Sequence, residues 1–389
     1  MRIVSIAART IRWPITARGA ARGCTERTAV LVEVRSDRGA IGLGEAAPLP
    51  GMSRDALEQV EQAIGAFAGL APFELARRDA PRSEARDGGP ILCEILDRPA
   101  AHAFAAAPPA ARFAIETALL DAIARELQVS IAALLCAWVD SNVLLGAHVG
   151  TPPCARSDAP RNVPLAAVVD DPDAARRAFA AGIRCFKIKL TAADDVDRVF
   201  AIAAAAPGAR LRIDANRSWP RAEVADRLAV LAPLPIDYVE EPCREAHRLL
   251  SSPLPCKLAL DESLGELSRD DLLAALRGPG LAAVILKPTL LGGLSAALAL
   301  AALARRFGVA PVASHALEGP IGTAACAELA LALGDEHPAG LAPHPALAGW
   351  SIEVEQLAAD HVRAVAAPGL GFVGLDLAGI VHAGPRLPP

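Results

Sequence analysis

The chain has 389 residues, a length that predicts one large domain together with a smaller one. Only 4% of the residues are aromatic and the net charge is −5, which excludes the stacking surface and basic field of a nucleic-acid-binding protein. No stretch of ~18 residues is free of charges and turn signals, and the first residues lack a leader pattern. We therefore expect a cytoplasmic protein without membrane contact.

The first part of the chain has the pattern of an α+β domain. Residues 1–15 and 28–45 are predicted strands, and the turn Ser36-Asp-Arg-Gly39 within the second stretch predicts a hairpin. Ser53 is a predicted N-cap for a helix over 54–68. A second, amphipathic helix is predicted over 111–127.

From residue 163 onward, short apolar strands alternate with helices, which is typical of parallel βαβ units. One of these helices is expected to begin at Pro172, capped by Asp171, and to end at Gly182. Eight strands are enough for a closed barrel. We therefore expect domains over 1–130 and 131–348, with 349–389 packing back on the first. The predicted strands cover residues 163–169, 185–189, 209–213, 236–239, 257–260, 282–286, 309–313 and 339–342.

The eight cysteines include no CxxC pair, so a zinc or redox motif is not indicated. Three of them lie in apolar stretches and are expected to be small core residues. They are Cys185, Cys256 and Cys326.

Polar residues stand where six successive predicted strands end, separated by 21 to 27 residues when their numbers are subtracted. One βα unit has about this length, and in a parallel barrel the carboxyl ends of the strands form the rim where active sites are built. The residues are Lys187 and Lys189, Asp214 and Asn216, Glu240, Asp261, Lys287, and Ser314 with His315.

The charges on this rim predict a metal site. Asp214, Glu240 and Asp261 would repel one another unless a cation lay between them, and three oxygen ligands favour a hard cation, Mg²⁺ or alternatively Mn²⁺. A lysine beside a cation and a second lysine has a lowered pKa, so Lys189 is a candidate base for a carbon-bound proton.

Each of these signals has a structural alternative. A single Lys-x-Lys is usually a solvated strand edge, a single strand-end aspartate is often a helix cap, and Lys287-Pro288 alone would suit a surface turn. All of them in register on successive strands favour the catalytic interpretation.

Five motifs resemble the enolase superfamily, in the branch that contains muconate-lactonising enzymes. The resemblance implies an α+β capping domain over a (β/α)7β barrel, Asp214, Glu240 and Asp261 as ligands of Mg²⁺, Lys189 as the base and Lys287 as the opposite cation. The motifs are Lys187-Ile-Lys189, Asp214-Ala-Asn216, Glu240-Glu-Pro242, Asp261-Glu-Ser263 and Lys287-Pro288 with Gly292-Gly293.

Within that branch, Gly44-Glu-Ala-Ala-Pro-Leu-Pro-Gly51 and Asp214-Ala-Asn-Arg-Ser-Trp219 resemble o-succinylbenzoate synthases. This resemblance implies a small-molecule carboxylate as the partner and a lyase reaction. The reaction would dehydrate a succinyl-hydroxycyclohexadiene carboxylate in menaquinone biosynthesis. Lys187, Asn216 and Ser314 are then expected to contact the substrate.

The chain departs from the synthase pattern after the seventh strand. His315 stands near the position at which the mandelate racemase branch has a catalytic histidine, and a substrate contact is the other role open to it. The amides of Gly319, Ile321 and Gly322 open a helix and are expected to hold a carboxylate. Arg18 and Arg22, in a loop over 16–27, would reach the same substrate or else lie in solvent.

Other functions stay open on the same machinery. They are racemisation of N-succinylamino acids, dipeptide epimerisation and muconate cycloisomerisation. The chain lacks an Asp-x-Asp in Gly340-Leu-Ala-Pro-His344, which weakens the epimerase alternative. A barrel that has lost its chemistry is disfavoured because all five charged residues are present.

Overall fold

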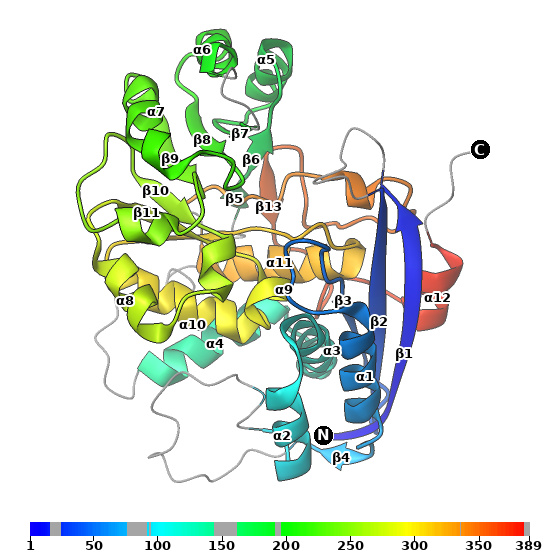
Figure 1. Ribbon diagram of the computed structural model, residues 1–389. Coiled ribbons are helices and arrows are strands. Elements are labelled where there is room, and N and C mark those ends of the chain that lie inside the picture. The colour runs from blue at the N-terminus through cyan, green and yellow to red at the C-terminus, as the bar shows by residue number, and fades with distance from the viewer. Residues whose placement is uncertain are drawn as a thin grey trace.

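The computed structural model describes residues 1–15, 25–75, 92, 95–143, 162–190, 196–334 and 336–384. It has an α+β domain beside a barrel of parallel strands and helices (Figure 1). This architecture confirms the predicted fold class. None of the described helices is both long and apolar enough to cross a membrane.

The first domain is built on a four-stranded sheet in the order β3-β2-β1-β4. Helices α1 (Leu57–Ala68), α2 (Arg98–Ala106) and α3 (Pro109–Leu127) accompany it. The predicted hairpin is confirmed, because Val30 pairs with Ala46 and Arg35 with Ile41. The strands are β1 (Arg2–Pro14), β2 (Glu26–Ser36), β3 (Ile41–Ala46) and β4 (Phe73–Glu74).

Two glycines of β3 allow α3 to lie directly on the sheet. A Cβ atom on Gly42 would lie 1.9 Å from the carbonyl oxygen of Ala118, and one on Gly44 would lie 2.0 Å from that of Ala114. Backbone can therefore approach backbone at these two positions only because no side chain intervenes.

Both helix predictions in this domain need correction. Helix α1 begins at Leu57, not at residue 54, and its first turn is closed by Gln59, whose side chain accepts from the N–H of Ala56. The Ser53 hydroxyl instead accepts from the N–H of Leu49 and shapes the preceding loop. Helix α3 is buried around most of its circumference rather than amphipathic, because β3 covers one side and α9 (Pro288–Leu291) of the barrel domain contacts another.

Seven parallel strands form a sheet in which every strand neighbours the next in the chain. Ala339 and Gly340 close it, because Ala339 O accepts from Ala166 N (2.9 Å) and Gly340 N donates to Ala313 O (2.8 Å). The predicted closed barrel of eight strands is therefore confirmed, the eighth being a two-residue bridge. The seven are β6 (Ala166–Val168), β7 (Cys185–Lys189), β8 (Arg210–Asp214), β9 (Ile236–Glu240), β10 (Leu258–Leu260), β11 (Leu281–Leu286) and β12 (Ala310–Ala313).

The barrel helices lie between the strands as predicted, with one exception. Asp171 caps α5 through a hydrogen bond from Ala174 N, as expected. Between β9 and β10, however, the expected helix is only a short 3-10 turn over Ala246–Leu249. The helices are α5 (Pro172–Ala180), α6 (Val196–Ala205), α7 (Val224–Leu231), α8 (Arg269–Arg277), α10 (Leu294–Arg305) and α11 (Pro320–Leu333).

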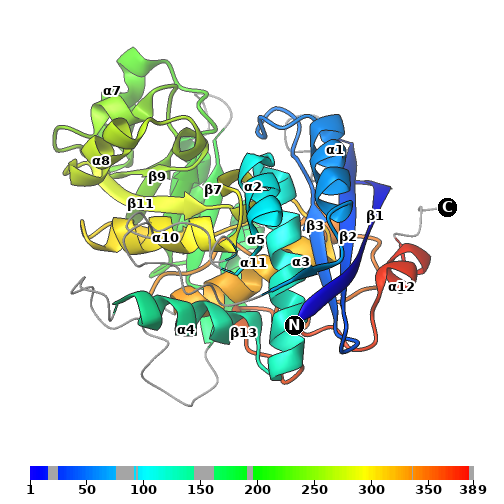
Figure 2. The same cartoon turned by 90° about the horizontal axis from the view of Figure 1, so that it is seen from below.

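The C-terminal segment returns to both domains. Strand β13 (His361–Arg363) pairs with β5 (Asn162–Pro164), and α12 (Leu377–His382) lies against β1 and β2 at the right of Figure 1. Figure 2 shows the same helix on the outer face of that sheet, with α4 (Ile131–Val143) below the barrel helices. Trp350 meets Trp13 edge-on at 5.4 Å between ring centroids.

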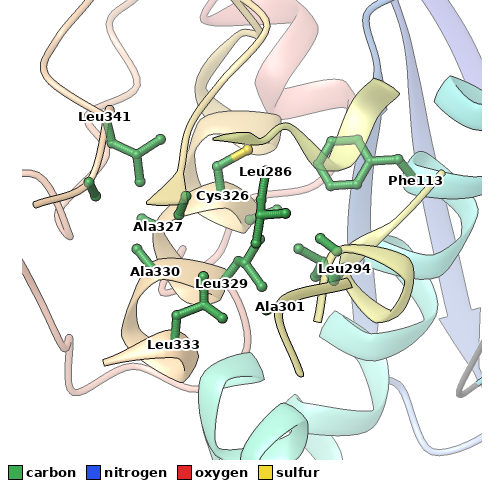
Figure 3. Close-up of a cluster of buried hydrophobic side chains, with 14 of the residues drawn as sticks. Phe113, Leu286, Leu294, Ala301, Cys326, Ala327, Leu329, Ala330, Leu333 and Leu341 are labelled. Atoms are coloured by element: carbon green, nitrogen blue, oxygen red, sulfur yellow. The ribbon is translucent and has the colours of Figure 1, made fainter. Parts of the chain in front are cut away.

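One large apolar core joins the two domains. Every residue of α11 is buried, and Cys326 and Leu329 of this helix share a cluster with Leu286 of β11 and Phe113 of α3 (Figure 3). Burial of Cys185, Cys256 and Cys326 confirms them as core residues. A separate small cluster fills the inside of the barrel and forms a floor beneath the strand ends: Tyr238, Ala259, Ala283, Ile285 and Val312.

Candidate active site at the carboxyl ends of the barrel strands

Strand register brings the predicted charges to one level. Lys189 pairs with Asp214 across β7 and β8, and Asp214 pairs with Glu240 across β8 and β9. Asp261 follows β10 directly and Lys287 follows β11. Three of the four lysines of the chain, all but the exposed Lys257, therefore gather at this rim.

Lys187 forms ion pairs with two of the carboxylates. Its Nζ lies 2.8 Å from Oδ2 of Asp214 and 2.8 Å from both carboxylate oxygens of Glu240. Burial alone would lower the pKa of Lys187, but Asp214, Glu240 and Asp261 outweigh it and hold this pKa well above its ordinary value. Lys187 is thus a fixed cation rather than a base.

Lys287 is the second fixed cation. Its Nζ donates to Oδ2 of Asp261 and lies 3.8 Å from the Sδ atom of Met52, which belongs to the first domain. Burial lowers the pKa of Lys287, but the Asp261 carboxylate outweighs it and the net shift is upward.

Lys189 has the opposite character. It is half-buried, and burial together with the nearby charges of Lys187 and Lys287 lowers its pKa, against the attraction of Asp214. A larger fraction of Lys189 is therefore neutral at a given pH, which is what proton abstraction requires.

The carboxylates have unequal proton affinities. Burial and the neighbouring Asp214 raise the pKa of Glu240 to about 8. Burial also disfavours the charged form of Asp214, but Lys187 more than compensates, so the pKa of Asp214 is lowered. Burial raises the pKa of Asp261 against the opposing charge of Lys287. These buried carboxylates lack enough positive charge to ionise together easily.

The donor set fits a hard divalent cation. Asp214, Glu240 and Asp261 are each at most 6% exposed, and Oδ1 of Asp261 is buried without a hydrogen-bond partner among the described residues. A buried carboxylate oxygen without a hydrogen-bond partner calls for an explanation, and the role of a cation ligand would supply one. Among the described residues, no three Asp, Glu, His or Cys side chains surround a common metal position. Instead, the Lys187 ammonium lies among the oxygens of Asp214 and Glu240.

Two other predicted contact residues have backbone roles. Asn216 is half-buried, with φ at +46°, and its N–H donates to Oδ1 of Asp214 at 3.1 Å. Ser314 is buried, and its hydroxyl donates to the Gly340 carbonyl at 3.2 Å, where the barrel closes.

His315 has a fixed tautomer. Its Nδ1 accepts a hydrogen bond of 3.1 Å from the N–H of Leu317, so the proton of the neutral ring is on Nε2. The ring stacks on His344 with centroids 4.0 Å apart. Burial, His344 and the three rim lysines lower the pKa of His315 well below its ordinary value, so the ring stays neutral.

The prediction that the amides of Gly319 and Gly322 hold a substrate carboxylate is wrong. Glu45, at the end of β3, accepts hydrogen bonds from the N–H groups of Gly319 (2.5 Å) and Gly322 (2.9 Å). Ile321 is buried in the same turn. Because a side chain of the protein already fills this anion site, no substrate carboxylate can use those two amides.

Three residues of the first domain were missed as neighbours of the site. Besides Glu45 and Met52, Arg27 is fully buried and donates to carbonyl oxygens on both sides of the domain boundary, Pro48 (2.8 Å) and Leu317 (2.9 Å). Glu45 lies in the Gly44–Gly51 motif and Met52 follows it directly, whereas Arg27 stands at the end of the 16–27 loop. The Gly and Pro residues of the motif predict a loop but do not show which part of the barrel domain that loop contacts. Arg18 and Arg22 lie outside the described residues.

Comparisons with known proteins agree with this geometry. Residues 170–375 match the family described as Enolase C-terminal domain-like. An o-succinylbenzoate synthase of Mycobacterium tuberculosis (strain ATCC 25618 / H37Rv) is 35% identical over 215 residues, which cover 53% of this chain and 64% of that protein. A chloromuconate cycloisomerase of Cupriavidus pinatubonensis is 29% identical over 324 residues, 80% of this chain and 78% of that protein.

Solved structures resemble the chain over nearly its whole length. A muconate lactonizing enzyme from Klebsiella pneumoniae superposes with a TM-score of 0.71 at 22% identity, covering 99% of both chains. A dipeptide epimerase from Methylococcus capsulatus, complexed with Mg and the dipeptide L-Arg-D-Lys, superposes with a TM-score of 0.70 at 25% identity, covering 95% of this chain and 99% of that one.

Proposed function

Because the chain belongs to the Enolase C-terminal domain-like family, in the muconate-lactonising branch of the enolase superfamily, we propose that it is a magnesium-dependent lyase of the o-succinylbenzoate synthase type. The observation that carries the proposal is the lysine arrangement around the carboxylates. Lys189 and Lys287 stand on β7 and at the end of β11, four strands apart in a ring of eight, and so on opposite sides of the barrel mouth.

The proposed metal ligands are Asp214, Glu240 and Asp261, whose buried oxygens need a cation. A bound Mg²⁺ would supply concentrated positive charge beside the substrate carboxylate, which lowers the cost of removing a proton from the adjacent carbon. We also propose that the reaction belongs to menaquinone biosynthesis. The proposed domain boundaries lie near residues 130 and 348.

The proposed reaction needs one base and one fixed cation. Neutral Lys189 takes the proton from the ring carbon that bears the carboxylate, and the C–H electron pair moves onto the carboxylate. This pair then forms a ring double bond to the neighbouring carbon, whose bond to the hydroxyl oxygen breaks. The ring hydroxyl leaves with a proton from the Lys189 ammonium, so that water and an aromatic acid are formed. The Lys287 ammonium stays protonated on the other face, where it offsets the negative charge that develops.

Racemisation of N-succinylamino acids is the second candidate. It is compatible with the same lysine arrangement, because neutral Lys189 can remove a proton from one face of an α-carbon and the Lys287 ammonium can donate one to the other face. Dipeptide epimerisation is less well supported. The stretch 340–344 carries no Asp-x-Asp, and its His344 is buried against His315.

The test is incubation of the purified protein and Mg²⁺ with the succinyl-hydroxycyclohexadiene carboxylate, and separately with N-succinylamino acids in D₂O. Aromatic product without α-deuterium exchange supports the synthase, and exchange alone supports the racemase. Lys189→Ala should abolish turnover while the Mg²⁺ affinity stays nearly unchanged. Lys257→Ala, at an exposed lysine away from the rim, is the control and should keep full activity. Turnover by the Lys189 variant would remove this residue from the base role.

A further inference from the structure

Three residues that carry none of the proposed chemistry join the segments that carry the three carboxylates. Arg217 follows Asp214 by three positions, Glu241 follows Glu240, and Ser263 follows Asp261 by two. They belong to three different strand ends, and they meet in one hydrogen-bonded cluster.

Glu241 is the centre of this cluster. Its side chain is fully buried, and Oε1 accepts hydrogen bonds from the backbone N–H groups of Asp261 and Ser263, both at 2.9 Å. The other oxygen, Oε2, accepts from the Ser263 hydroxyl at 2.9 Å. The Glu241 carboxylate therefore fixes the backbone on which the Asp261 side chain is mounted.

Arg217 holds Glu241 from the opposite side. Its Nε donates to Oε2 of Glu241 at 3.1 Å, and its Nη2 donates to the Ser263 hydroxyl at 2.9 Å. The outer edge of the guanidinium makes two bonds of 2.8 Å to Glu266. The backbone N–H of Arg217 also donates to the Glu241 carbonyl at 2.7 Å, so side chains and main chains tie the same two segments.

The backbone at these positions is strained. Asn216, Arg217 and Glu241 have φ angles of +46°, +59° and +42°, in the left-handed region that residues with a Cβ rarely adopt. Such conformations persist only where surrounding contacts over-determine them, and they cluster at functional sites. The bonds between Arg217 and Glu241 supply that constraint here.

We propose that Glu241 and Arg217 are positioning residues that set the relative placement of Asp214, Glu240 and Asp261 for cation binding. Neither contacts the reacting groups. Each acts on the strand-end backbone, so that the three carboxylates are held at one separation before the ion binds. The inference rests on the function proposed above, because it takes these three residues as the metal ligands.

The experiment compares variants of two half-buried arginines, in the full chain, by calorimetric titration with Mg²⁺. Arg217→Met removes the side-chain hydrogen bonds from Arg217 to Glu241 and Ser263. Arg227→Met is the matched control, since Arg227 is similarly sheltered (20% against 13% side-chain exposure) but pairs with Glu223 and lies over the Trp219 ring at 5.4 Å. Among the described residues, its hydrogen bonds do not reach Glu241, Ser263 or a proposed ligand. Partners that orient metal ligands typically contribute about 10- to 100-fold in affinity. We expect a rise of that order in the Mg²⁺ dissociation constant for Arg217→Met, partial recovery in Arg217→Lys, and no change in Arg227→Met.

A merely structural role would give a different result. It would lower the unfolding midpoint in EDTA and leave the Mg²⁺ affinity of the folded protein unchanged, and that outcome overturns the proposal. If Arg217→Met does not fold, Ser263→Ala removes only the hydroxyl between Arg217 and Glu241, and unchanged Mg²⁺ affinity in that variant overturns the proposal as well. If the wild-type protein binds no Mg²⁺, both the proposed function and this proposal are overturned. If wild type and variants bind Mg²⁺ equally well, only the positioning role of Glu241 and Arg217 is overturned.

Discussion

The carboxylate of Glu45 accepts a hydrogen bond of 2.5 Å from the backbone N–H of Gly319, so a side chain of the first domain closes the first turn of the barrel helix α11. Similar contacts recur elsewhere: Glu116 accepts from Ser295 at the start of α10, and Glu328 accepts from Ala132 at the start of α4. Buried carboxylates at helix N-termini thus tie together segments that are far apart in sequence.

These carboxylates predict a stability that depends on pH. Burial raises the pKa of Glu45, Glu116 and Glu328 from the ordinary 4.5 to about 7 in each case. The folded state therefore binds more protons than the unfolded state between about pH 4.5 and pH 7. Each group contributes stability that is complete below pH 4.5 and is lost as the pH rises through 7, about 1–3 kcal/mol per group.

The measurement is urea unfolding of wild type and Glu45→Gln in EDTA at pH 5 and pH 8. The free energy of unfolding of wild type, relative to that of the variant, should decrease from pH 5 to pH 8, because only the wild type titrates at this position. A difference that is the same at both pH values would contradict the prediction.

Gly44 should tolerate no side chain. Its Cβ would lie 2.0 Å from the Ala114 carbonyl oxygen, so Gly44→Ala must push β3 away from α3 and should lower the free energy of unfolding by about 3 kcal/mol. Gly65 is the matched control: it is exposed within α1, nothing lies within 4 Å of its Cβ position, and Gly65→Ala should stabilise by about 0.5–1 kcal/mol. Chemical denaturation of both variants tests the pair.

Removal of metal should abolish turnover without unfolding the protein. Lys187 pairs with Asp214 and Glu240, Lys287 pairs with Asp261, and Glu240 can hold a proton because its pKa is raised to about 8. The metal-free site is therefore not left with three unpaired charges. With EDTA the circular dichroism spectrum should not change.

In Lys187→Met two buried carboxylates lose their cation, so added Mg²⁺ should raise the unfolding midpoint by more than in wild type. An equal rise in both proteins would show that Lys187 does not neutralise this pair.

His315 should contribute to substrate binding and not to proton transfer. Its ring is neutral with the proton on Nε2, which offers one hydrogen-bond donor. In His315→Asn the Nε2 donor is lost, because the shorter amide does not reach its position, while Oδ1 remains an acceptor for Leu317. KM should rise about fivefold, the value of one hydrogen bond of about 1 kcal/mol. The pH dependence of kcat should not change. Loss of one limb of the pH–rate profile would instead identify His315 as an acid or base, and the exposed His102→Asn serves as control.

The sequence by itself determined the barrel and the positions of its rim charges. Strand and helix periodicity give the order of the βα units, and in a parallel barrel every strand end must fall on one rim, so Lys189, Asp214 and Lys287 follow from their places in the repeat. The same local reasoning succeeds for the cap of α5, because Asp171 and Pro172 act within one turn.

Only the tertiary structure decided which partners these residues have. Lys187 bridges two carboxylates, Glu241 holds the backbone of Asp261, and Glu45 fills the helix terminus that was expected to bind substrate. Each contact joins groups separated by 20 to 274 residues, and a hydrogen bond is formed by proximity in space, which no local pattern encodes. The burial of α3 on most sides has the same cause, since a helix sequence records its own periodicity but not the second domain that covers it.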